Sequence, residues 1–159
     1  MCGIFAYMGH IPLPILEVLK VLHILESEQE PDEMSPVGGH GAGIAYFNQK
    51  GTLALTKVGK TNNISPVNDL QLQLGETANN SSRLILGHVR RASPEFLNTI
   101  QHKKCTQPYK PNCTHQTLGF TMLTAHNGYA QNYQQLKNTL KQPHQYESQK
   151  NTLIDSEVI

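Results

Sequence analysis

A cysteine directly after the initiator methionine is the residue of this chain with the clearest capacity for chemistry. The chain begins Met1-Cys2-Gly3, and because cysteine is small, an aminopeptidase is expected to remove Met1. Cys2 would then carry a thiol with an ordinary pKa near ~8.5 and an α-amine with one near ~7.7–8.0. The amine can act as the base for its own thiol at neutral pH. Taken alone, a cysteine at position 2 could equally be an arbitrary residue without a chemical role.

Charged and amide side chains recur where apolar stretches end. Residues 87–93 read GHVRRAS and residues 125–129 read AHNGY, each after an apolar run, and residues 154–159 (IDSEVI) close the chain. Loops at the ends of buried strands can converge on one point of a rigid sheet. Each motif alone has an ordinary reading: Asn127-Gly128 is a common hairpin turn, and a single arginine or aspartate is usually a surface charge.

In this order, the Cys2 start and the three motifs resemble the class II glutamine amidotransferases, a branch of the N-terminal-nucleophile hydrolases. The resemblance covers residues 2–159. It implies that the Cys2 thiol attacks the side-chain amide carbon of L-glutamine, forms a thioester and releases ammonia, after which water yields glutamate. Short stand-alone members of the family, whose ammonia acceptor is unknown, show the nearer resemblance.

The resemblance also implies a role for each motif residue. Asn127 and Gly128 would donate to the tetrahedral oxyanion, one through a side-chain amide and the other through a backbone N–H. Arg90 would clamp the substrate α-carboxylate, for which its planar fork is suited, and Asp155 would receive the α-ammonium. Ala92 and Ser93 would line the same pocket. The implied site is Cys2, Arg90, Ala92, Ser93, Asn127, Gly128 and Asp155.

Some positions depart from the relatives that aminate sugars or nucleotides. Those relatives have an arginine and an aspartate where this chain has Val37 and His40, and the residue after the clamp arginine, often aromatic there, is Arg91 here. The glutamine pocket is expected to be kept, but the second substrate of those subfamilies is not implied. His88 and His126 are expected to pack and to form hydrogen bonds rather than to catalyse.

Composition limits the class of protein. The chain has 159 residues, 38% of them hydrophobic, and a net charge of +1. This length suits one domain with a core, and the charge gives no reason to expect a nucleic-acid partner. The start lacks the basic region of a signal peptide, and residues 11–25 are interrupted by charges, so no membrane association is expected. These features predict a cytoplasmic protein.

The three cysteines do not form a recognisable framework. An odd number argues against a set of disulfides. Cys105 and Cys113 lie close to His102 and His115, but their spacing fits no common zinc finger, in which paired ligands lie about two to four residues apart. A plain loop is expected there, with no metal and no other cofactor.

Periodicity predicts the elements that must position the site. Strands are expected at 2–8, 44–47, 52–58, 83–89 and 118–125, the first one buried, and helices at 12–28, 66–74 and 132–140. Residues 92–116 are expected to form a long surface loop. The elements predict an α+β domain. The resemblance implies, more specifically, a four-layer αββα sandwich of two mostly antiparallel sheets, with residues 2–159 as its N-terminal part and the family domain continuing beyond Ile159.

Two alternatives to a glutamine amidotransferase remain open. One is a different N-terminal-cysteine hydrolase that acts on N-acyl amides. The other is a catalytically silent module that docks onto a synthase. The sequence does not identify the ammonia acceptor, a synthase partner or the oligomeric state, and it assigns no role to His40, Arg91, Cys105 or Cys113.

Overall fold

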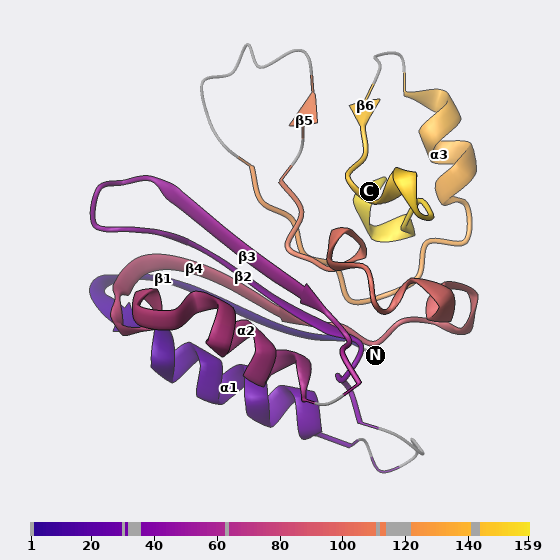
Figure 1. Ribbon diagram of the computed structural model, residues 1–159. Coiled ribbons are helices and arrows are strands. Elements are labelled where there is room, and N and C mark those ends of the chain that lie inside the picture. Colours follow the sequence, from indigo (N-terminus) through magenta and orange to yellow (C-terminus); the bar gives the residue numbers. More distant parts are fainter. Residues whose placement is uncertain are drawn as a thin grey trace.

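The computed structural model describes residues 2–29, 31, 36–62, 64–110, 112–113, 122–140 and 144–159. These residues form an α+β fold built on a four-stranded antiparallel sheet (Figure 1). The elements are β1 (Gly3–Pro14), α1 (Ile15–Ser27), β2 (Gly41–Phe47), β3 (Leu53–Gly59), α2 (Pro66–Leu74), η1 (Gly75–Asn79), β4 (Ser81–Val89), η2 (Pro94–Thr99), η3 (Lys103–Cys105), β5 (Asn112–Cys113), α3 (Tyr133–Thr139), β6 (His144–Gln145), η4 (Ser148–Lys150) and η5 (Asp155–Glu157).

The main sheet has the strand order β1-β4-β2-β3. β1 and β4 pair with Gly3 opposite Val89, and β2 and β4 pair with Ala42 opposite the same Val89. β1 and β2 therefore begin, and β4 ends, at the same end of the sheet. Cys2 precedes β1 and Arg90 follows β4, so the pairing register alone places these two residues next to each other.

Helices α1 and α2 cover one face of this sheet (Figure 1). Their buried residues recur at helical spacing, as in Ile15, Val18, Leu19 and Leu22 of α1. The start of α2 is fixed by Ser65, whose side chain accepts a hydrogen bond from the Asn68 N–H at 3.2 Å, and by Pro66 in the first turn. Sheet residues of the same core include Ile44, Tyr46, Val58, Ile85 and Val89.

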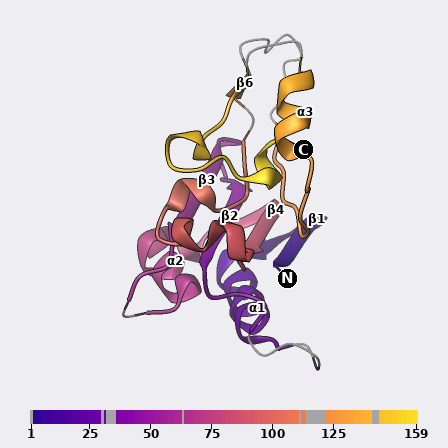
Figure 2. The ribbon, with the colours of Figure 1, turned by 90° about the vertical axis from the view of Figure 1, so that its right-hand side faces the viewer.

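The segments that follow β4 lie on the other side of the sheet, and Figure 2 shows them from a second direction. Two glycines allow their backbone to approach the strands closely. A Cβ atom on Gly43 would lie 2.1 Å from the Gln107 carbonyl oxygen, and one on Gly59 would lie 2.5 Å from that of Gln101. Because both neighbours are backbone atoms, only glycine fits at these positions without a shift of the chain.

The prediction of a surface loop at 92–116 is wrong for residues 105–109, whereas residues 101–104 are exposed as expected. Cys105, Thr106, Gln107 and Tyr109 are each at most 4% exposed. The polar composition of this stretch suggested a solvated loop, but the close approach at Gly43 and Gly59 buries it against the sheet. The sequence feature connected with this burial is therefore the pair of glycines in β2 and β3, and not the composition of the loop.

The first and last predicted strands also differ from the structure. β1 is longer than expected and its burial alternates: Phe5 and Tyr7 pack against the core, whereas Ile4 and Met8 are 39% and 85% exposed, so the prediction of a buried strand is wrong. Half of the strand predicted at 118–125, residues 118–121, lies outside the described residues. In the described part, Thr124 pairs with Tyr109 through two backbone hydrogen bonds of 2.9 Å.

A second large sheet is not present among the described residues. The only other pairing between named strands there joins β5 to β6, with two residues in each strand. The α+β class predicted from the sequence is confirmed at this level. No described helix combines the length and the apolar character that crossing a membrane requires.

Candidate active site

The seven residues of the site implied by the resemblance line one cavity of about 490 Å³ at the end of the main sheet. They are Cys2, Arg90, Ala92, Ser93, Asn127, Gly128 and Asp155. The sheet supplies Cys2 and Arg90 through the register of β1 and β4. The remaining polar groups come from the segments packed on the opposite side of the sheet from α1 and α2.

Cys2 lines the cavity, and its thiol contacts the backbone of Arg91. Its Sγ accepts a hydrogen bond from the Arg91 N–H at 3.2 Å and donates to the Arg91 carbonyl oxygen at 3.4 Å. Burial raises the pKa of the Cys2 thiol, while the Arg91 N–H and the Arg90 guanidinium act in the opposite direction. A base close to this thiol is therefore needed to generate the thiolate, and the α-amine of a processed Cys2 is on the same residue.

Asn127 lines the cavity and is hydrogen-bonded to the backbone nitrogen of Cys2. The Cys2 N–H donates to Asn127 Oδ1 at 2.9 Å, which fixes the orientation of the amide and leaves Nδ2 as its donor. Within the described ranges, neither Nδ2 nor the Gly128 N–H has a hydrogen-bond partner. Two adjacent donors without acceptors, beside a thiol, can stabilise an oxyanion.

The segment that carries Asn127 is held by Gln107. The Gln107 side-chain amide donates to the His126 carbonyl oxygen at 3.1 Å and accepts from the His126 N–H at 2.5 Å. The His126 ring nitrogen Nδ1 lies 3.1 Å from Ser156 Oγ. His126 therefore packs and forms hydrogen bonds next to the site, as the sequence predicted.

Arg90 is a buried cation that lines the cavity. It is 4% exposed, and its guanidinium donates to the Thr99 carbonyl oxygen at 3.2 Å and to Thr99 Oγ1 at 2.7 Å. Among the residues that the structure describes, no carboxylate lies within ion-pair distance of it. Burial lowers the pKa of Arg90. Buried charges are normally paired, so an anionic ligand would relieve this position.

Asp155 is the matching buried anion. It is 3% exposed, its Oδ2 accepts from the Ala130 N–H at 2.8 Å, and its Oδ1 accepts from the Ser156 hydroxyl at 3.4 Å. No lysine, arginine or histidine in the described part of the chain forms an ion pair with it. The cavity thus offers one cation and one anion that do not neutralise each other at contact distance. A zwitterionic ligand would satisfy both.

His40 and His88 have different surroundings near this site. His40 Nδ1 accepts from the Ala92 N–H at 3.1 Å, and burial followed by the nearby Arg91 lowers the pKa of His40 to about 4. His88 is fully buried, its ring nitrogens have no hydrogen-bond partner in the described structure, and burial lowers its pKa to about 3. Both rings are neutral at physiological pH. His40 supports the cavity wall, whereas His88 only packs, so the hydrogen bond predicted for His88 is not found.

Several supporting residues were missed by the sequence reasoning. Thr99 accepts hydrogen bonds from Arg90 and so orients it. Gln107 forms hydrogen bonds with the backbone of His126. Ser156 contacts both the His126 ring and the Asp155 carboxylate. Thr99 and Gln107 lie in the stretch predicted to be a surface loop. No motif marks them, because their role depends on how that stretch folds back onto the sheet.

The cysteine and histidine cluster considered from the sequence is only partly described. Cys105 is fully buried and free. His115 and the side chain of Cys113 lie outside the described residues. The described residues contain no group of three or more histidine, cysteine, aspartate or glutamate side chains that could hold a metal ion.

Comparisons with protein-family models, with curated proteins and with solved structures found no significant match to this chain.

Proposed function

We propose that this chain is a glutamine-hydrolysing domain of the class II glutamine amidotransferase type, with Cys2 as its N-terminal nucleophile after loss of Met1. One observation carries the proposal: buried Arg90 and buried Asp155 line the same cavity as the Cys2 thiol, and neither has an ion-pair partner among the described residues. A free α-amino acid supplies one carboxylate and one ammonium. The amide side chain of glutamine supplies the bond to be cleaved.

In the proposed reaction, the α-amine of Cys2 takes the proton from its own thiol, and Sγ attacks the amide carbon of glutamine. The resulting oxyanion accepts hydrogen bonds from Asn127 Nδ2 and the Gly128 N–H. The protonated amine then gives its proton to the leaving nitrogen, which departs as ammonia, and a thioester joins the glutamyl group to Sγ. Water, deprotonated by the same amine, attacks the thioester and releases glutamate and the free thiol.

The main sheet and its two helices also bear on the fold to which this site belongs. One sheet with its layer of two helices is present, which is compatible with half of a four-layer αββα sandwich. We propose that residues 2–159 belong to such a domain and that the reaction takes place in the cytoplasm.

The charged pair provides the test of substrate class. We expect Arg90→Lys and Asp155→Asn each to lower kcat/KM for glutamine by roughly 30- to 1,000-fold, equivalent to ~2–4 kcal/mol, because each leaves one substrate charge unmatched. Lysine should replace Arg90 poorly, since a point charge cannot form the bidentate fork. The measurement is the release of glutamate from glutamine under steady-state conditions.

Glutaramate, which is glutamine without its α-amine, is the matched control substrate. It should be poor for the native protein and nearly insensitive to Asp155→Asn, because it has no ammonium for Asp155 to bind. If both variants hydrolyse glutamine normally, or if the native protein prefers uncharged acyl amides, the acyl-amide hydrolase becomes the better assignment.

A further inference from the structure

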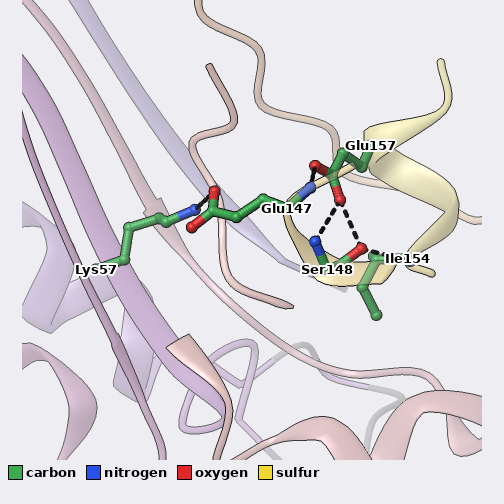
Figure 3. Close-up of polar contacts among 5 residues, drawn as sticks. All are labelled: Lys57, Glu147, Ser148, Ile154 and Glu157. Carbon is green, nitrogen blue, oxygen red and sulfur yellow. Dashed lines mark hydrogen bonds and ion pairs between the residues drawn. The ribbon is translucent and has the colours of Figure 1, made fainter. Parts of the chain in front are cut away.

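A polar network connects the main sheet to the segment that carries Asp155 (Figure 3). It begins at Lys57 on β3, whose side chain is only 6% exposed and whose Nζ lies 2.5 Å from the Glu147 carboxylate. Lys57, Glu147, Ser148 and Glu157 do not line the cavity, whereas Ile154, the fifth residue drawn in Figure 3, does. The other four residues can therefore affect the site through Ile154 and the neighbouring Asp155.

The second part of the network folds the C-terminal segment back on itself. The Glu157 carboxylate accepts hydrogen bonds from the Glu147 N–H, from the Ser148 N–H at 2.9 Å and from the Ser148 hydroxyl at 2.5 Å. Ser148 Oγ in turn accepts from the Ile154 N–H at 3.0 Å. The backbone on both sides of Asp155 is thereby fixed, because Ile154 precedes it and Glu157 ends the same short η5 helix.

Lys57 also contacts Tyr109, which pairs with Thr124 in the segment that carries Asn127. Its Nζ lies 4.9 Å from the centroid of the Tyr109 ring, and Tyr109 pairs with Thr124 through two backbone hydrogen bonds of 2.9 Å. One lysine of the sheet is therefore linked to the segment of Asp155 directly and to that of Asn127 through Tyr109. A partly buried ion pair of this kind contributes little net stability, but it restricts geometry.

We propose that Glu157, together with Lys57, positions Asp155 and so sets the preference of this site for substrates that carry an α-ammonium, an inference that rests on the proposed function. Asp155 lies on a helix of three residues and not on a strand of the main sheet. Its carboxylate is held by the Ala130 N–H and the Ser156 hydroxyl only as long as η5 keeps its place. Side chains that bind charged groups need such support to act within a fraction of an ångström.

The test uses Glu157→Gln, which keeps the size of the side chain but removes its charge. We expect KM for glutamine to rise roughly 10-fold with little change in kcat, because a contact with the α-ammonium is made equally in the ground state and the transition state. Turnover of glutaramate should stay within about two-fold of the native value, since no ammonium is present. Glu76→Gln, at an exposed position on η1, is the matched control and should change neither substrate.

A second measurement works without any activity. In hydrogen exchange, the Ser148 and Ile154 amides should be protected in the native protein and should exchange faster in Glu157→Gln, while the amides of β4 remain unchanged. Ser148→Ala should have the same effect on the Ile154 amide and replaces Glu157→Gln if that variant does not fold.

The outcomes separate this inference from the proposed function. If the native protein does not hydrolyse glutamine, the proposed function is wrong. Unchanged hydrogen exchange at the Ile154 amide in the variants would overturn the positioning role of Glu157. If Glu157→Gln lowers the turnover of glutamine and glutaramate equally, Glu157 supports the fold in general and the inference is wrong. Loss confined to glutamine, with faster exchange at Ile154, supports it.

Discussion

Cys2→Ala is expected to abolish glutamine hydrolysis, with a loss on the order of 10⁴- to 10⁶-fold in kcat, because no other group can form the thioester. The fold should persist. Cys2 is only partly buried, and its side chain is held by two contacts with the Arg91 backbone, so the free energy of unfolding should change by about 1 kcal/mol or less. Activity assays combined with thermal unfolding of the same preparation measure both quantities.

Cys105→Ser is the control for this variant. Cys105 is fully buried, does not line the cavity, and burial raises the pKa of its thiol, all of which describe an inert cysteine. Activity per folded molecule should be retained, and the same is expected for Cys113→Ser. A result in which Cys105→Ser is folded but inactive, while Cys2→Ala is active, would reverse the assignment of the nucleophile.

The second large effect is expected at Asn127. Asn127→Ala should lower kcat by ~10²- to 10³-fold with a smaller change in KM, because the amide donates to a charge that develops only in the transition state. The variant also removes the acceptor for the Cys2 N–H, which lies 2.9 Å from Asn127 Oδ1. Both losses act on the chemical step, and steady-state kinetics separates them from weaker substrate binding.

Asn132→Ala is a matched control for that measurement. Asn132 is exposed, precedes α3 and makes no side-chain capping hydrogen bond, so its removal should leave kcat and KM unchanged. If Asn127→Ala raises only KM, then Asn127 binds the substrate and another group must accompany Gly128 at the oxyanion.

The part of the site nearest the sheet was predictable because its residues lie at the ends of strands that could be recognised in the sequence. The pairing of these strands then determines which of the residues are neighbours. Once β1 and β4 pair with Gly3 opposite Val89, Cys2 and Arg90 must lie together. Helix α2 was predicted with its observed limits, since Ser65 and Pro66 are strong local start signals. These features depend on neighbours in the sequence or on one ladder of hydrogen bonds.

The supporting residues were not predictable for the opposite reason. Thr99 and Gln107 act on the site only because residues 94–109 pack against β2 and β3, at positions where Gly43 and Gly59 leave room. Glu157 acts through backbone groups of Glu147 and Ser148 rather than through a recognisable side-chain pattern. Such contacts follow from the tertiary fold, and neither periodicity nor composition marks them.

The most direct test of the central claim is the intact mass of the protein, quenched in acid while it turns over glutamine. If Cys2 is the N-terminal nucleophile, a species should appear that lacks Met1 and carries a glutamyl group, and proteolysis should locate that group on the peptide that begins at Cys2. Hydrolysis of glutamine by protein that retains Met1 would rule out this mechanism, because the α-amine that must act as the base would then be a peptide nitrogen.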